Sequence, residues 1–142
     1  MIMVDYLQLL RSLKVGPRDR NVMVGEVSSG LKAVAKDLDI PVLVLSQLNR
    51  DIEKSKDRRP KLSDLRDSGS IEQDADVIMF IHASSREEEV MYQSPSAPRD
   101  VELLIEKQRN GATGSVPLRF FPAETRFEGR EDNDFSDNEC GF

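Results

Sequence analysis

The apolar residues of this chain gather in short runs, with one longer amphipathic segment between the first two. Runs at Met1–Val4 and Val42–Leu45 have the length and composition of buried strands. Between them, apolar residues recur at the spacing of one helix face, and Pro41 prevents the helix from continuing. The residues of this face are Val27, Leu31, Val34, Ala35 and Leu38. The order strand, helix, strand predicts parallel strands joined by a helix that packs on the sheet.

The second half of the chain predicts further strands. Val77–Ile81 is an uninterrupted apolar run, which is typical of a parallel strand that is covered on both faces. Two more strands are expected at Val101–Ile105 and Val116–Phe121. The Asn110-Gly111 pair between them favours a tight turn, and hence a hairpin. The sequence therefore predicts an α/β fold with a mostly parallel sheet, flanking helices and a C-terminal hairpin.

Polar segments separate these elements. Lys14–Asn21 is basic and contains helix breakers, and Asn49–Pro60 is highly charged, so both are predicted to be loops. Beyond Phe127 acidic residues dominate and apolar residues are nearly absent. We therefore expect one folded domain over residues 1–127 and a disordered acidic tail over residues 128–142.

Composition narrows the classes of function. The 142 residues carry a net charge of -6, so only a local basic patch will attract nucleic acid. Cys140 and His82 are the single cysteine and the single histidine of the sequence, which argues against a zinc site built from these residue types. No apolar run approaches the length of a membrane span and no signal peptide is visible. We expect a cytoplasmic protein without membrane contact.

Polar side chains follow the first two strands, at the carboxyl ends where the ligand crevice of an open α/β sheet lies. Asp5 ends the first strand, and Ser46 and Gln47 end the second. A carboxylate here suits Mg²⁺ in P-loop nucleotidases, and an amide suits contact with an attacking water and a phosphate oxygen. Without further context, polar strand ends that form turns are the more common explanation of the same residues.

Two cations near the hairpin form a second group of candidates. Lys107 and Arg109 are two residues apart at a strand end, so their side chains point to the same side. Cations at a solvated edge strand often serve only to prevent aggregation. Alternatively, they reach a phosphate held by a neighbouring molecule and offset charge that develops during phosphoryl transfer.

A third group lies in the loop before the apolar run at Val77. Ser68, Gly69 and Ser70 break the chain in a way that opens a loop and caps a helix. Arg66, Asp67 and Gly69 are therefore expected on a surface edge held by a rigid core, where binding residues concentrate. The simpler alternative is a solvated connection between a helix and a strand.

Four blocks carry a resemblance that changes these odds. They are VDYLQLL at Val4–Leu10, VLVLSQLNR at Val42–Arg50, KLSDLRDSGSIEQDADVIMF at Lys61–Phe80 and KQRNGATG at Lys107–Gly114. In sequence, order and spacing they resemble the motifs of the DnaB-type replicative DNA helicases, which are hexameric motors with a RecA-like fold. The resemblance covers the chain from about Met1 to Phe127.

The resemblance implies a role for each candidate at the nucleotide. Asp5 falls in the family's Walker B block, which holds Mg²⁺ against the phosphates of ATP. Gln47 matches the phosphate-sensing glutamine. Lys107 and Arg109 match a pair that acts on the nucleotide of the next subunit, with the arginine as a finger in trans. ATP and Mg²⁺ are the implied cofactors, with Gln47, Lys107 and Arg109 as catalytic residues.

The resemblance also implies contact with single-stranded DNA. Arg66, Asp67 and Gly69 match positions that line the central channel and contact the DNA backbone. Glycine permits close approach of the main chain to a phosphate, and a ring repeats each arginine on every subunit. The basic Lys14–Arg20 loop is a second candidate for the channel.

Three expected parts of the motor are missing from the sequence. No GxxxxGK[ST] P-loop occurs in the chain, and the family's upstream catalytic glutamate and N-terminal collar domain have no counterpart. The resemblance therefore identifies the C-terminal portion of a RecA-like P-loop NTPase core. The chain alone is not expected to hydrolyse ATP.

These observations leave more than one functional hypothesis. The first is a part of a hexameric, ATP-dependent 5′ to 3′ replicative DNA helicase, with single-stranded DNA, primase and a helicase loader as partners. The alternative is a non-catalytic RecA-like interaction module that joins or poisons a ring. A RecA-type recombinase or related ring ATPase is a third possibility, although the LSQLNR and DLRDSGSIEQDAD blocks fit the helicase better.

Overall fold

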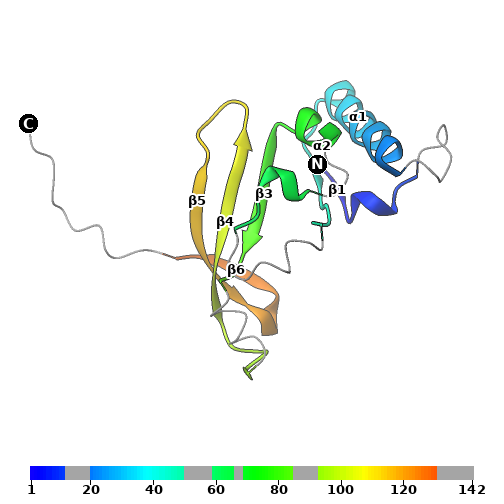
Figure 1. Cartoon of the computed structure of the whole chain (residues 1–142). Coiled ribbons are helices and arrows are strands. Elements are labelled where there is room, and N and C mark those ends of the chain that lie inside the picture. The colour runs from blue at the N-terminus through cyan, green and yellow to red at the C-terminus, as the bar shows by residue number, and fades with distance from the viewer. Residues whose placement is uncertain (12–19, 50–58, 66–68, 85–92, 131–142) are drawn as a thin grey trace, which may run out of the picture. The chain divides into compact units, whose positions relative to one another are not determined.

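The computed structural model describes residues 1–11, 20–49, 59–65, 69–84 and 93–130 (Figure 1). They belong to two compact units, one of Met1–Phe80 with Ile105–Gly114 and the other of Ile81–Leu104 with Ser115–Phe142. The elements are β1 (Ile2–Val4), η1 (Leu7–Leu9), α1 (Arg20–Leu38), β2 (Val42–Val44), η3 (Leu62–Asp64), α2 (Gly69–Asp74), β3 (Val77–His82), β4 (Arg99–Gln108), β5 (Gly114–Phe121), η4 (Pro122–Glu124) and β6 (Arg126–Gly129).

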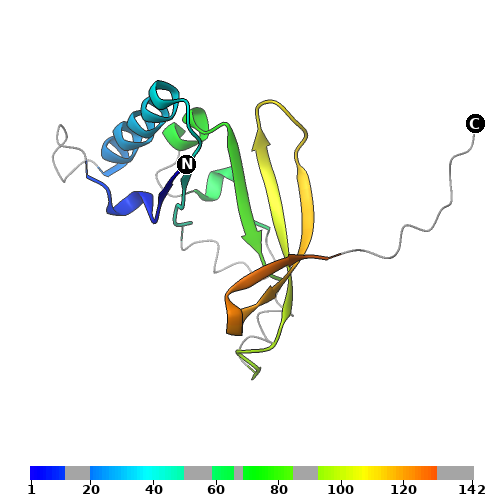
Figure 2. The same cartoon turned by 180° about the vertical axis from the view of Figure 1, so that it is seen from behind.

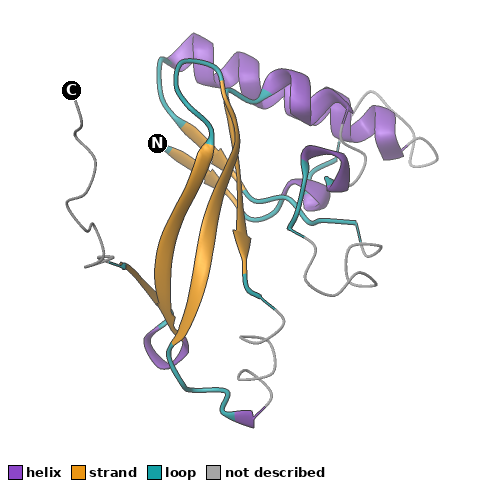
Figure 3. Cartoon of the chain, turned by 60° about the vertical axis from the view of Figure 1, so that its left-hand side comes forward, coloured by secondary structure: helices purple, strands orange, loops and turns teal. Residues whose placement is uncertain are grey.

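β1 and β2 form a parallel two-stranded sheet, as the strand, helix, strand pattern predicted. Ile2 lies opposite Val42 and Val4 opposite Val44. The segments that follow β1 and β2 stay side by side, because Leu7 N donates to Leu45 O at 2.9 Å. The connection between them contains α1, which is the long helix in Figure 3. This crossover is what brings the ends of β1 and β2 to one edge of the sheet.

α1 ends in a hydrogen-bonded cap just before Pro41. Asp39 takes the left-handed conformation, with φ of 50°. Its N–H donates to Lys36 O at 3.3 Å, and Ile40 N–H donates to Ala35 O at 3.2 Å. This is the Schellman pattern, which satisfies carbonyls that the helix itself leaves unpaired. The helix therefore stops through its own cap before the proline is reached.

The helix that the periodicity predicted is present, but its most buried positions lie one turn earlier than expected. Val24 is 2% exposed and Ser28 is 9% exposed, whereas Leu38 is 59% exposed. α1 contacts α2, η1 and β2. The apolar spacing therefore identified the helix correctly, while the neighbouring elements determined which of its residues are covered.

β3 is a strand, but the prediction that it is covered on both faces is wrong for the described residues. Ile78 and Phe80 are buried, whereas Val77 and Met79 alternate with them at 45% exposed. Its neighbour in the sheet is β4, and Figure 1 shows the two strands running in opposite directions. An antiparallel strand can leave one face uncovered, unlike a strand between two layers of helices.

The remaining strands complete a four-stranded sheet in the order β3-β4-β5-β6. β4 and β5 form the predicted hairpin and lie side by side in Figures 1 and 2. Residues 109–113 connect them, and no described glycine has positive φ, so Asn110-Gly111 does not form a two-residue turn. The α/β class with a C-terminal hairpin is confirmed, with the sheets mixed rather than mostly parallel.

The second unit ends in an antiparallel pair, β5 with β6. Phe120 lies opposite Phe127 in this pair, and their rings stack with centroids 4.5 Å apart. β6 continues to Gly129, so regular structure extends past the predicted domain end at Phe127. Residues 131–142, which hold most of the predicted acidic tail, lie outside the described part of the chain. Among the described helices, none is both long and apolar enough to cross a membrane.

Candidate functional site

The carboxyl edge of the β1–β2 sheet carries Asp5 and Gln47. Asp5 follows Val4 directly and Gln47 comes three residues after Val44, which is the parallel partner of Val4. Both residues are exposed. The parallel register therefore places a carboxylate and an amide at the same edge, where the sequence predicted them.

Gln8 is a residue of this edge that the sequence did not single out. Its Nε2 donates to Ser46 Oγ at 3.0 Å, and its Oε1 accepts from Gln47 N at 3.3 Å. Gln8 therefore ties η1, after β1, to the chain after β2 and fixes the backbone from which the Gln47 side chain projects. The only available signal was its place in the VDYLQLL block, where an amide near a strand end is otherwise unremarkable.

The donors at this edge fit a nucleotide-bound Mg²⁺ in part. Mg²⁺ prefers oxygen ligands and is usually held by one or two carboxylates together with phosphates and water. Asp5 supplies one exposed carboxylate, and the described residues contain no cluster of three or more His, Cys, Asp or Glu side chains that would hold a metal alone. Such an edge suits a metal that arrives with the phosphates of a nucleotide.

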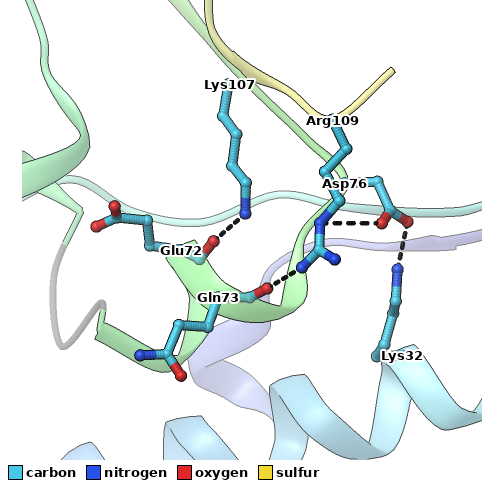
Figure 4. Close-up of polar contacts among 6 residues, drawn as sticks. All are labelled: Lys32, Glu72, Gln73, Asp76, Lys107 and Arg109. Atoms are coloured by element: carbon cyan, nitrogen blue, oxygen red, sulfur yellow. Dashed lines mark hydrogen bonds and ion pairs between the residues drawn. The ribbon is translucent and has the colours of Figure 1, made fainter.

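Lys107 and Arg109 both extend from the end of β4 to the end of α2 (Figure 4). The Lys107 Nζ donates to Glu72 O, and the Arg109 Nη2 donates to Gln73 O. Carbonyls in the last turn of a helix have no partner within the helix, and cations are favourable beside them. The two cations thus point to the same side, as predicted, and in this structure they cap α2.

Asp76 joins this group from the chain between α2 and β3. Its Oδ1 lies 3.5 Å from Arg109 Nε, and its Oδ2 is hydrogen-bonded to Lys32 of α1. The hydrogen bond from Lys32 holds the pKa of Asp76 below its ordinary value of 3.8, while desolvation acts in the opposite direction. The charges of Lys32, Arg109 and Lys107 add to the lowering of this pKa. Asp76 is therefore ionised at neutral pH and pairs with two cations, Lys32 of α1 and Arg109 after β4.

Lys32 and Asp76 were also missed at the sequence level. Asp76 lies in the QDAD segment before β3, where an acidic turn was expected but no partner was evident. Lys32 lies on α1, where a charged residue usually faces solvent. The two are 44 residues apart in the chain, so periodicity contains no signal for the pair.

α2 is held against α1 by direct contacts. Ser29 Oγ donates to Asp74 Oδ2 at 3.0 Å. A Cβ added to Gly25 would lie 2.7 Å from Ser70 Oγ, so the two helices approach closely at this point. Gly25, Ser29 and Lys32 follow the spacing of one face of α1, which is the face that meets α2 and Asp76.

The residues predicted to contact DNA are only partly described. Gly69 begins α2 and is exposed, with nothing within 4 Å of a Cβ built on it. Arg66 and Asp67 lie outside the described residues, as does most of the Lys14–Arg20 segment, of which Arg20 begins α1. The roles of these residues stay predictions.

Comparison with known proteins gives a consistent result. Residues 1–129 match the family described as "DnaB-like helicase C terminal domain". "Replicative DNA helicase DnaB" of Haemophilus influenzae is 51% identical over 129 residues, which are 90% of this chain and 26% of that relative. The protein of the same name from Geobacillus stearothermophilus is 42% identical over 128 residues, covering 89% of this chain and 27% of the relative.

Solved structures show the same likeness. A solved ATPase domain superimposes with a TM-score of 0.78 at 40% identity, covering 91% of this chain and 44% of that chain. "The Structure Of A DnaB-Like Replicative Helicase And Its Interactions With Primase" gives a TM-score of 0.76 at 38% identity, covering 91% and 30%. The chain thus spans less than half of each of these four proteins.

Proposed function

Because this chain belongs to the family of DnaB-like helicase C-terminal domains, we propose that it forms part of a hexameric, ATP-dependent replicative DNA helicase. Its α/β fold is the C-terminal portion of the RecA-like fold of such ATPase domains. In the proposed assembly it moves 5′ to 3′ on single-stranded DNA in the cytoplasm. Primase and a helicase loader are the proposed protein partners, and one of the similar solved structures concerns interactions with primase.

The observation that carries this proposal is the shared edge of β1 and β2. Their parallel register brings Asp5 and Gln47 together, although the two lie far apart in the chain. Asp5 would hold Mg²⁺ through a carboxylate oxygen, and the metal would neutralise charge on the phosphates of ATP. The Gln47 amide accepts a hydrogen bond from water and donates one to a phosphate oxygen, so it orients the attacking water.

In the same proposal, Lys107 and Arg109 act on the nucleotide of the neighbouring subunit. Both cations come from the end of β4, and the Arg109 side chain is 50% exposed. A planar guanidinium that is always charged suits the oxygens of a phosphoryl group in transfer, and Lys107 adds a point charge beside it. Arg66, Asp67 and Gly69 are the proposed contacts to the backbone of single-stranded DNA.

A chimeric ring tests the proposal. The part of this chain that aligns with the Haemophilus influenzae helicase, over 129 residues at 51% identity, replaces its counterpart in that helicase. We expect the chimera to hydrolyse ATP, and Arg109→Ala to lower kcat by roughly 10³-fold or more, as loss of an arginine finger does. Binding of a fluorescent nucleotide should change little, because the finger acts mainly in the transition state.

The matched control is Arg126→Ala, which removes an arginine that pairs with Glu124 and Glu128 in the second unit. It should leave hydrolysis unchanged. Wild-type hydrolysis in the Arg109→Ala ring would refute the proposed finger. A chimera that assembles into rings but never hydrolyses ATP would favour the non-catalytic interaction module instead.

A further inference from the structure

We propose that Asp76 is a positioning residue for Arg109, and that Lys32 and the end of α2 complete the support that orients the guanidinium. This inference rests on the proposed function, because it assumes that Arg109 acts on a phosphate. It adds two residues that belong to neither the nucleotide edge nor the DNA loop. In this inference α2 also helps to orient Arg109, besides connecting that loop to β3.

Asp76 holds residue 109 through both its main chain and its side chain. Arg109 N donates to Asp76 O at 3.0 Å, which fixes the backbone at the end of β4 against the start of β3. The carboxylate Oδ1 then lies 3.5 Å from Arg109 Nε. A long side chain that is anchored at its backbone and again near its tip has far fewer rotamers available than a free arginine.

Lys32 holds the other oxygen of the same carboxylate. Its Nζ is hydrogen-bonded to Asp76 Oδ2, while Oδ1 faces Arg109 (Figure 4). Each oxygen therefore faces its own cation, and this pair of contacts favours one orientation of the carboxylate plane. Lys32 projects from the middle of α1, which is the longest described helix. Its hydrogen bond therefore fixes the orientation of the Asp76 carboxylate relative to that helix.

α2 supplies the third point of support. Gln73 O accepts from Arg109 Nη2 and Glu72 O accepts from Lys107 Nζ. The Gln73 bond and the Asp76 contact together engage the Nε and Nη2 side of the guanidinium. Among the described residues nothing bonds to Nη1, whose two N–H groups are left for an external acceptor. A guanidinium held along one edge and open at its tip is the arrangement that suits an acceptor on another molecule.

Orientation explains these contacts better than stability does. The Arg109 and Asp76 side chains are 50% and 59% exposed, and ion pairs this exposed contribute little to folding. If the cations served only to cap α2, the carbonyl contacts would be enough and Asp76 would not be needed. The carboxylate of Asp76 instead orients the Arg109 side chain, since it determines which edge of the guanidinium is occupied.

The first experiment examines this chain itself. In Asp76→Asn, we expect the Arg109 Nε–Hε group to gain fast motion by ¹⁵N relaxation and to exchange with water several-fold faster. The matched control is Asp74→Asn, which also removes one negative charge at the end of α2 but affects only the hydrogen bond from Ser29. It should leave the Arg109 signal unchanged. Equal behaviour of Arg109 in the two variants would overturn the proposal.

The second experiment measures turnover in the chimeric ring. Asp76→Asn is expected to lower kcat by about tenfold while the KM for ATP changes little, since misplacement of a catalytic group costs transition-state binding. Asp76→Glu should restore part of the loss, and Asp74→Asn should behave as the unsubstituted chimera. An unchanged kcat in Asp76→Asn, in a ring where Arg109→Ala is inactive, would refute the positioning role. If Arg109→Ala is itself fully active, the proposed finger role of Arg109 fails, and with it the catalytic role of Asp76, while the mobility result on the chain stands.

Discussion

Asp76 shows how one exposed carboxylate acquires a defined role from its neighbours. Three cations lower its pKa, and the hydrogen bond from Lys32 is the largest contribution. A carboxylate that is ionised more readily in the folded state than in the unfolded chain stabilises the fold only while it is charged. The same contacts that orient Arg109 therefore leave a signature in the dependence of stability on pH.

We expect the stability contributed by Asp76 to be complete at neutral pH and to be lost in acid. Its unfolded pKa is near 3.8 and its folded pKa is lower, so the contribution is present above 3.8 and disappears as the pH falls through the folded value. Asp76→Asn removes the titrating group. Thermal midpoints of the chain and of this variant should therefore differ at about pH 7 and converge as the pH falls below 3.8 and through the lower folded pKa. A gap that stays constant over this range would contradict the assignment.

At the scale of elements, α1 contains two glycines in different surroundings. Gly25 faces α2, where an added Cβ would lie 2.7 Å from Ser70 Oγ and 3.3 Å from Ser70 Cβ. Gly30 has nothing within 4 Å of the corresponding position. Helix propensity favours alanine at both positions, so any difference between the two substitutions reports the packing of α1 on α2.

Gly30→Ala should raise the free energy of unfolding by about 0.5–1 kcal/mol, because the unfolded chain loses flexibility and no clash is created. Gly25→Ala should not give this gain, since Ser70 must move. Chemical denaturation of both variants provides the measurement. In the Ser70→Gly background, Gly25→Ala should recover most of the expected gain. Equal gains for both glycines in the unaltered chain would show that α1 and α2 do not pack as described.

At the scale of the molecule, the first unit leaves apolar side chains of its β1–β2 sheet exposed. Met3 and Leu43 are register partners, at 66% and 42% exposed, and Leu45 is 52% exposed. In contrast, Leu7, the first residue of η1, is 3% exposed. Exposed apolar patches on soluble proteins mark sites of association. The first unit therefore combines a buried interior at Leu7 with an exposed apolar face on the β1–β2 sheet.

Leu43→Thr should change the free energy of unfolding by less than about 0.5 kcal/mol, as substitutions at exposed positions usually do. It should also weaken self-association of the chain, which sedimentation velocity over a concentration series measures. Leu7→Ala is the matched contrast, because truncating a buried leucine costs about 2–5 kcal/mol. A large loss of stability in Leu43→Thr would mean that this face is covered in solution.

The sequence by itself determined the positions of the main elements and one edge of the candidate site. Apolar runs located β1, β2, β3, β4 and β5, and helical spacing located α1. Because a helix between two short strands favours a parallel pair, Asp5 and Gln47 could be placed at one edge without coordinates. The four motif blocks were sufficient to recognise the family over residues 1–127, which the match over residues 1–129 confirmed.

Only the tertiary structure decided which faces are covered and which charges meet. The alternating burial of β3 and the earlier buried stripe of α1 depend on what packs beside them. Lys32, Asp76 and Arg109 come from separate elements, and their meeting depends on how α1, α2 and β4 pack within the first unit. Periodicity records the local geometry of a chain, whereas a contact between residues 44 apart depends on the packing of whole elements. That physical difference separates the predicted edge at Asp5 and Gln47 from the support of Arg109, which became evident only in three dimensions.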